Sequence, residues 1–267
     1  MNLKSTIIEE YGEKCECCGE LTWQFLTIDH TGNWGGEHRK LLNKDNTNSR
    51  GGKNVYQWLK TNGFPKDKFR LLCYNCNCCT GFNGFCQHEF LNGNGKQCKC
   101  GKELNLENQF NFHKVCNIDL CKECVLGKSI TRNNGKDAIK KYATLDQRRS
   151  WNKAKTLRLR LAITEKYGGA CQCCGEDNYM FLTIDHKNND GFEDKKKFKN
   201  DANKFYRYIR DSELQNDKYQ ILCSNCNCCK GAYGQCYHDL ISKLNVPSIS
   251  IEEYKGLIKH NSVALTG

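Results

Sequence analysis

The sequence predicts an α+β protein made of small units that metal ions stabilise. Three observations predict this class. Hydrophobic residues make up 38% of the 267-residue chain, where globular domains usually reach about 45–50%, so one large apolar core is not expected. The chain holds 21 cysteines, and small folds with little apolar surface to bury often depend on such cross-linking groups. Finally, a set of short cysteine-rich motifs occurs twice along the chain.

The cysteines are expected to bind metal because the chain carries no sign of export. The N-terminus, MNLKSTIIEEYGEK, has no apolar stretch of signal-peptide length, and no apolar run approaches the ~18 residues of a membrane helix. We therefore expect a reducing intracellular compartment (the cytoplasm, or the nucleus of a eukaryotic host), no secretion and no membrane partner. Paired cysteines in such a compartment bind metal more often than they form disulfides. A disulfide scaffold is the alternative.

Five CxxC pairs predict several structural zinc ions. In a CxxC turn two thiolates converge on one tetrahedral Zn²⁺, and two such pairs complete a four-cysteine site. The pairs are Cys15 and Cys18, Cys73 and Cys76, Cys121 and Cys124, Cys171 and Cys174, and Cys223 and Cys226.

Four motifs recur in the same order, which predicts a tandem duplication with a first copy at about 5–90 and a second at about 160–241. Two of the matches are offset by 156 residues and two by 150, so the second copy is six residues shorter in its middle. The matching pairs are CECCGE (15–20) and CQCCGE (171–176), FLTIDH (25–30 and 181–186), LLCYNCNCCTG (71–81) and ILCSNCNCCKG (221–231), and FCQHEF (85–90) and QCYHDL (235–240).

The duplication sets the predicted domain organisation. Between the copies, the pair Cys121 and Cys124 needs two further ligands to complete a zinc site. Cys98 and Cys100 are imperfect candidates because only one residue separates them, and His113 or Cys116 could replace one of them. The predicted parts are a zinc unit at 1–92, a zinc-ribbon-like module at 93–135, a basic helical linker at 136–167, a second zinc unit at 168–242 and a tail at 243–267.

Each copy is expected to hold the same local elements. The runs WQFLTID and YMFLTID are β-rich and place Asp-His at the end of a strand. Residues 54–64 and 203–214 have helical spacing of apolar residues. The CNCC segment that follows the second CxxC pair opens a short helix.

Three polar residues of the first copy suggest hydrolytic chemistry. Asp29 and His30 end the predicted strand, and Asn77 directly follows the second CxxC pair. If one zinc ties the two pairs together, these side chains gather in one place. Carboxylate and amide oxygens suit a hard cation such as Mg²⁺ or another divalent ion, and an imidazole can deprotonate water. This combination suits metal-assisted hydrolysis of phosphodiester bonds. The second copy has the same set in Asp185, His186 and Asn227.

Each of these residues also has a simpler interpretation. Asp29 and His30 could form a surface dyad, or His30 could be a further zinc ligand. Asn77 could simply cap a helix, since asparagine is a favoured N-cap residue.

The order C-x2-C, I-D-H, L-L-C-x2-C-N resembles the HNH or His-Me finger endonucleases, in particular those of the phage recombination endonuclease VII type. The resemblance implies tandem, treble-clef-like ββα-metal units that structural zinc clamps. It also implies that Asp29 and Asn77, with Asp185 and Asn227, bind the catalytic cation. The two histidines, His30 and His186, would activate water. The longer pattern is similar to HNH-like proteins of phages and large viruses, and the middle module to zinc ribbons often found beside such nucleases.

The two copies differ at one motif. The first reads Gly-Glu-His-Arg at 36–39, where His38 and Arg39 are available for a phosphate or a metal ion. The second reads Phe-Glu-Asp-Lys at 192–195. This difference favours the first copy if only one copy cuts.

A departure from the HNH pattern supports a second function. Lys68 and Lys218 lie near the place where many HNH proteins carry a central asparagine. The alternative function is therefore a catalytically degenerate zinc protein that binds nucleic acid, such as a viral regulator, or a scaffold for protein partners.

Further cysteines and histidines exceed the needs of one four-cysteine site in each copy. They could form a second zinc site, half of it made by a Cys-x-His pair, or they could be buried thiols that pack as small apolar groups. The residues are Cys17, Cys78, Cys79, Cys86 and His88 in the first copy, and Cys173, Cys228, Cys229, Cys236 and His238 in the second.

The charge balance predicts nucleic acid as the partner. Lysine and arginine total 41 against 30 acidic residues, a net charge of +11, which attracts polyanions over long range. Basic residues concentrate in the predicted linker helix, which could contact phosphates or form a solvated face. We expect double-stranded or branched DNA as the substrate and a monomer that imitates a nuclease dimer, with one site per strand.

Overall fold

The computed structural model describes residues 3–32, 34–42, 52–83, 86–88, 109–112, 118–121, 145–212 and 218–245. It is an α+β structure with small two-stranded sheets, as predicted. The chain divides into two compact units, of which one contains Met1–Cys78 and Cys228–Gly267 and the other Cys79–Asn227. No helix of the described residues is long and apolar enough to cross a membrane.

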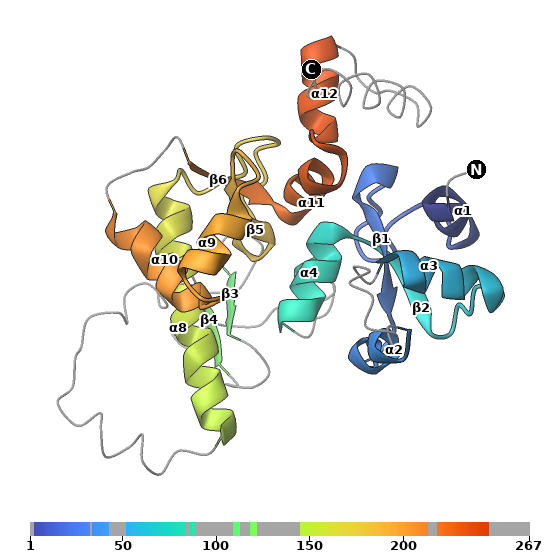
Figure 1. The fold of residues 1–267 in the computed structure, drawn as a ribbon, viewed down its shortest axis with the longest axis horizontal. Coiled ribbons are helices and arrows are strands. Elements are labelled where there is room, and N and C mark those ends of the chain that lie inside the picture. The colour runs from blue at the N-terminus through green and yellow to red at the C-terminus, as the bar shows by residue number, and fades with distance from the viewer. Residues whose placement is uncertain are drawn as a thin grey trace. The chain divides into compact units, whose positions relative to one another are not determined.

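The first copy alternates short helices with two strands that lie far apart in sequence (Figure 1). The strands pair antiparallel, with Leu26 opposite Cys73 and Asp29 opposite Arg70. The elements are α1 (Leu3–Glu10), η1 (Trp23–Phe25), β1 (Leu26–His30), α2 (Gly35–Leu42), α3 (Gly52–Thr61), β2 (Phe69–Cys73) and α4 (Tyr74–Asn83).

The second copy repeats this order, and its strand register is the same. Leu182 lies opposite Cys223 and Asp185 opposite Gln220, so the matched offsets of the sequence motifs carry over to the strand pairing. The elements are α8 (Leu145–Lys166), whose last eight residues correspond to α1, then η2 (Tyr179–Phe181), β5 (Leu182–His186), α9 (Gly191–Lys197), α10 (Ala202–Asp211), β6 (Tyr219–Cys223), α11 (Ser224–Tyr233) and α12 (Tyr237–Leu244).

Each copy has a small apolar core beside its strand pair. The fully buried side chains come from the 3-10 turn, from both strands, from the helix α3 or α10 and, in the second copy, from α8. In the first copy they include Phe25, Leu26, Leu59, Leu71 and Leu72, and in the second Leu161, Phe181, Leu182, Ile209 and Ile221.

The division into units passes through two helices, α4 and α11, so each unit combines parts of both copies. In one unit, the Phe25 ring of the first copy packs against Tyr237 of the second, with ring centroids 6.3 Å apart. In the other unit, Phe181 of the second copy packs against His88 of the first, at 5.1 Å. Each core is therefore covered in part by the terminal segment of the other copy.

The helix after each second CxxC pair begins earlier than predicted. It starts at Tyr74 and Ser224, so Asn77 and Asn227 lie within its first turn and are not N-cap residues. The reason is that the CxxC turn itself is helical. Its N–H groups find a sulfur acceptor, since Cys76 N donates to Cys73 Sγ at 3.5 Å. Asn77 and Asn227 are therefore not needed for capping.

Some predicted features lie outside the described residues. In the middle module, the structure describes only the backbone of β3 (Gln109–Phe112) and β4 (Ile118–Cys121), which pair antiparallel. The domain boundaries predicted from the sequence stay predictions. The positions not described are Cys98, Cys100, His113, Cys116, Cys124, the side chain of Cys121, linker residues 136–144 and tail residues 246–267.

Candidate zinc sites and candidate active sites

Two four-cysteine groups come together as the CxxC spacing predicts. In each group all four sulfur atoms lie within 4.8 Å of one another. Three of the four thiols are buried, and the cysteines of the described residues are thiols, not disulfides. The groups are Cys15, Cys18, Cys73 and Cys76 in the first copy, and Cys171, Cys174, Cys223 and Cys226 in the second.

The sulfur geometry fits zinc. A tetrahedral ion with zinc–sulfur bonds of about 2.3 Å needs sulfur atoms about 3.8 Å apart. Cys18 Sγ lies 3.8 Å from Cys73 Sγ, and Cys174 Sγ lies 3.8 Å from Cys223 Sγ. Interaction with Cys15 and the other neighbouring thiols raises the pKa of Cys76 far above its usual range. Four such thiols can therefore all lose their protons only if a cation neutralises them.

Local backbone contacts explain why each first CxxC pair forms its turn. Gly19 has φ +78°, a conformation that glycine adopts without strain, and its N–H donates to Cys15 O at 2.9 Å. Glu16 N donates to Leu71 O at 2.9 Å and so joins the turn to β2. The second copy repeats both contacts, through Gly175 and through Gln172 to Ile221.

The additional ligand candidates form close pairs inside each unit. In one unit Cys17 lies within 4.8 Å of Cys76, and Cys236 within 4.8 Å of His238, measured between ligand atoms. In the other unit Cys173 and Cys226 are equally close, and Cys86 Sγ lies 3.6 Å from His88 Nδ1. These pairs have ligand chemistry suited to zinc.

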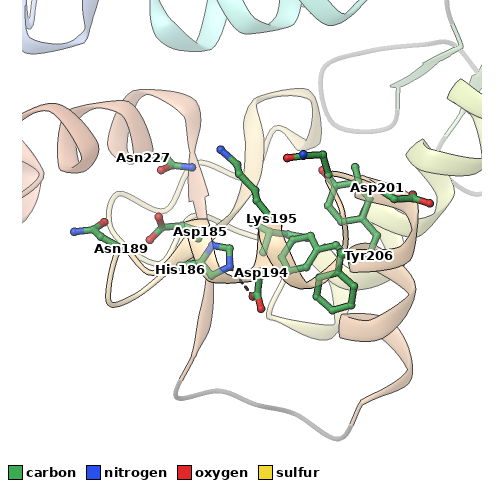
Figure 2. Close-up of a pocket in the computed structure, with 14 residues that line it drawn as sticks. Asp185, His186, Asn189, Asp194, Lys195, Asp201, Tyr206 and Asn227 are labelled. Atoms are coloured by element: carbon green, nitrogen blue, oxygen red, sulfur yellow. Dashed lines mark hydrogen bonds and ion pairs between the residues drawn. The ribbon is translucent and has the colours of Figure 1, made fainter. Parts of the chain in front are cut away.

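In the second copy, one pocket collects the three residues predicted to carry chemistry. Asp185, His186 and Asn227 line a cavity of about 440 Å³. In Figure 2 these three side chains lie next to one another along the pocket. Lys195 lines the same pocket and provides a positive charge for an anionic ligand.

The orientation of the Asn227 amide follows from its neighbours. The Thr183 hydroxyl donates to Leu222 O at 3.1 Å, so its oxygen can only accept from Asn227 Nδ2, 2.8 Å away. The amide nitrogen is therefore held against β5. The amide oxygen, which could bind a cation, is the atom left for the pocket.

Asp185 is buried, with 7% of its surface exposed. Its Oδ2 accepts a hydrogen bond from Gln220 Nε2 at 2.6 Å. Because the Gln220 amide is neutral, it orients the carboxylate without neutralising its charge. The strand register dictates this contact, since Asp185 and Gln220 are directly opposed.

His186 is held by an acidic residue that the sequence did not single out. His186 Nε2 lies 2.8 Å from Asp194 Oδ2, as the dashed line in Figure 2 shows. Asp194 also accepts from Tyr219 Oη at 2.6 Å and from Lys218 Nζ at 3.2 Å. Burial alone would raise the pKa of Asp194, but the hydrogen bonds from Tyr219, His186 and Lys218 outweigh it and lower this pKa.

These contacts determine the tautomer of His186. An ionised carboxylate only accepts hydrogen bonds, so His186 carries its proton on Nε2 and its lone pair on Nδ1. Gly191 packs against this edge of the ring, where an added Cβ would lie 3.0 Å from Nδ1. Lys218 lies near the place where many HNH proteins carry a central asparagine. It contacts the carboxylate of Asp194, which in turn contacts His186.

The first copy has the same Asp-His strand end but different neighbours. Arg70 Nε lies 3.1 Å from Asp29 Oδ2 and forms an ion pair with it. His30 Nε2 lies 2.9 Å from His38 Nδ1, and His38 is packed among aromatic rings, including Trp34 at 4.8 Å. Burial, together with His38 and Arg39, lowers the pKa of His30 to about 4.

His38 occupies in the first copy the position that Asp194 has in the second. The 156-residue offset between the copies aligns these two residues in the sequence. Its Nε2 is buried with no hydrogen-bond partner in the described part of the chain. His38 is thus not available at the surface for a phosphate, contrary to the sequence-based expectation, because the rings of Trp34, Trp58 and Phe69 enclose it.

Two basic residues predicted to contact phosphate have structural roles instead. Arg160 donates to Leu182 O at 2.6 Å. Lys166 donates to Arg210 O at 3.1 Å and Ile209 O at 3.3 Å, two of the last carbonyls of α10. Lys155 and Arg158 of α8 are exposed and keep the predicted role as candidates for phosphate contact.

No family model, no curated protein and no solved structure matches this chain.

Proposed function

We propose that this chain is a metal-dependent DNA endonuclease of the HNH or His-Me finger class. The observation that carries the proposal is the pocket of the second copy, which is lined by a carboxylate, an imidazole and a carboxamide. The antiparallel strands β5 and β6 followed by α11 have the order of a ββα-metal core, with a four-cysteine group in the place of its zinc clamp.

The residues of this pocket suit a hard divalent cation. Asp185 and the amide oxygen of Asn227 would hold a Mg²⁺ ion or another divalent cation, since both are oxygen ligands. When bound, such a cation supplies positive charge for the scissile phosphate and the leaving oxygen. Lys195 adds a further positive charge at the rim of the same pocket.

His186 is suited to act as the general base. Its Nε2–H is fixed on Asp194, so Nδ1 can take the proton of the attacking water. The negative charge of Asp194 then stabilises the imidazolium that forms. Asp194 thus orients the imidazole through Nε2, and Nδ1 performs the proton transfer.

A DNA substrate is supported by the net charge of +11. The alternative is a zinc protein that binds nucleic acid without cutting it. The ion pair between Arg70 and Asp29 in the first copy favours this alternative for that copy, because the guanidinium occupies the carboxylate that a cation would need.

Cleavage of supercoiled plasmid by zinc-loaded protein tests the proposal. The double variant Asp29→Asn/Asp185→Asn makes the result independent of which copy cuts. We expect cleavage that requires Mg²⁺, stops in EDTA and falls by about 100-fold or more in the double variant, with zinc content unchanged. Plasmid binding without cleavage would support the alternative function and contradict the nuclease.

A further inference from the structure

We propose that the two copies are unequal, and that the second copy alone holds the catalytic cation and cuts. This inference rests on the proposed function and specifies which of the two similar sites performs it. It concerns two contacts, one at the aspartate and one at the histidine, that differ between the copies.

The first difference is the residue that faces the aspartate across the strand pair. In the first copy it is Arg70, which forms an ion pair with Asp29 at 3.1 Å. In the second it is Gln220, which donates one neutral hydrogen bond to Asp185 at 2.6 Å. A divalent cation at Asp29 would have to displace a permanently charged guanidinium or bind beside it, and like charges repel. At Asp185 the residue in the same cross-strand position is a neutral amide, so the facing strand adds no positive charge there.

The second difference is the residue behind the histidine. Asp194 is an anion that fixes His186 as the Nε2–H tautomer. His38 can be a donor or an acceptor toward His30 Nε2, 2.9 Å away. If His38 donates, then His30 carries its own proton on Nδ1 and has no lone pair there for water. In neither arrangement does His38 provide the negative charge that would stabilise a protonated His30.

The frame around the two sites is the same, so the difference is local. Both copies have the same strand register and the same four-cysteine geometry. The first copy therefore has the same local fold as the second, but Arg70 and His38 contact its aspartate and histidine. The sequence alone favoured the first copy because His38 and Arg39 suggested ligands, whereas the contacts favour the second.

Binding of Mn²⁺ to the zinc-loaded 267-residue chain, followed by electron paramagnetic resonance, tests the cation part without any cleavage. We expect one Mn²⁺ site per chain that Asp185→Asn weakens by at least about tenfold and Asp29→Asn changes by less than about twofold. Equal loss in the two variants, two equivalent sites, loss in Asp29→Asn alone, or no Mn²⁺ binding would overturn the inference. A single site at Asp185 in a protein that never cuts DNA would refute the proposed nuclease but keep the cation asymmetry.

Substitution of the residue that faces the aspartate tests whether its charge decides cation binding. Gln220→Arg should weaken Mn²⁺ binding by at least about tenfold, whereas Gln220→Met, which removes the hydrogen bond without adding charge, should change it by less than about threefold. Conversely, Arg70→Gln/His38→Asp in an Asp185→Asn background should restore a Mn²⁺ site. If Gln220→Arg binds Mn²⁺ like the wild type, the charge argument is wrong.

Asp194 acts through His186 and is therefore a positioning residue. Asp194→Asn should lower kcat by about 10- to 1000-fold with KM changed little. Two-bond ¹H–¹⁵N spectra of the histidine rings should show His186 as the Nε2–H tautomer in the wild type and a mixture in the variant. His38→Asn is the matched control and should leave kcat within about twofold. Equal loss of kcat in both variants, or an unchanged His186 tautomer in Asp194→Asn, would overturn this role.

Discussion

The two copies of the repeat agree at the cysteines and differ around the histidine. The four-cysteine groups, the turn glycines and the strand registers match contact for contact. The groups that touch the aspartate and histidine do not match, since Arg70 and His38 stand where the second copy has Gln220 and Asp194. The frame around the four-cysteine groups is thus the same in the two copies, while the residues that surround the aspartate and the histidine have changed.

The largest expected effect concerns the feature that the copies share. Replacing Cys73 or Cys223 by Ser should release one zinc ion and unfold the surrounding copy. Because structural zinc contributes roughly 10–16 kcal/mol of apparent binding free energy in small domains, each variant should lose most of its stability. Zinc content and chemical denaturation would measure both changes. Full zinc retention in either variant would show that the four-cysteine group of that copy is not a zinc site.

The glycines beside the two histidines should separate the copies by activity. An added Cβ at Gly191 would press on His186 Nδ1 at 3.0 Å, and one at Gly35 on His30 Nδ1 at 2.9 Å. Small displacements of a reacting group can cost about 100-fold in rate, so Gly191→Ala should lower plasmid cleavage by about tenfold or more. Gly35→Ala is the matched control and should leave the rate within about twofold. Similar losses in both variants would mean that both copies cut.

A smaller effect is expected from a basic residue that occurs in both copies. Lys4 and Arg160 take matching positions, and each donates to a backbone carbonyl, Gln24 O and Leu182 O respectively. Burial, offset in part by Cys229 and Cys228, lowers the pKa of Lys4 to about 8. The unfolded chain thus holds this proton at a higher pH than the folded chain does, so stability should rise as the pH increases above 8.

Chemical denaturation between pH 7.5 and 9 would measure this rise, which should be on the order of 1 kcal/mol, since one pKa unit corresponds to about 1.4 kcal/mol. Lys4→Met should abolish it. Arg160→Met should not change it, because arginine keeps its proton in this range. A rise of equal size in Lys4→Met would assign the pH dependence to other groups.

The sequence predicted the frame better than it predicted the site. CxxC spacing and the repeat offsets determine which thiols meet and how β1 pairs with β2, because a four-cysteine site allows little freedom. The neighbours of His186 depend on how α9 packs against β5 and β6, which no local pattern encodes. Asp194 was visible in the sequence only as the counterpart of His38 at the same offset, and Tyr219 only as a strand residue.

The exchange of terminal segments between the copies also could not be predicted from the repeat. Tyr237 belongs to the end of the second copy, yet its ring packs against Phe25 of the first copy. Local propensity describes the helix α12 but does not indicate which of two similar cores it covers. Contacts between residues so distant in sequence are set by packing alone.

The inequality of the two copies can be measured by plasmid cleavage with the single variants His30→Ala and His186→Ala, each with its zinc content verified. We expect that His186→Ala loses about 100-fold or more of the Mg²⁺-dependent rate and that His30→Ala cuts like the wild type, with nicked circles as the first product. Equal loss in the two variants, or loss in His30→Ala alone, would contradict it.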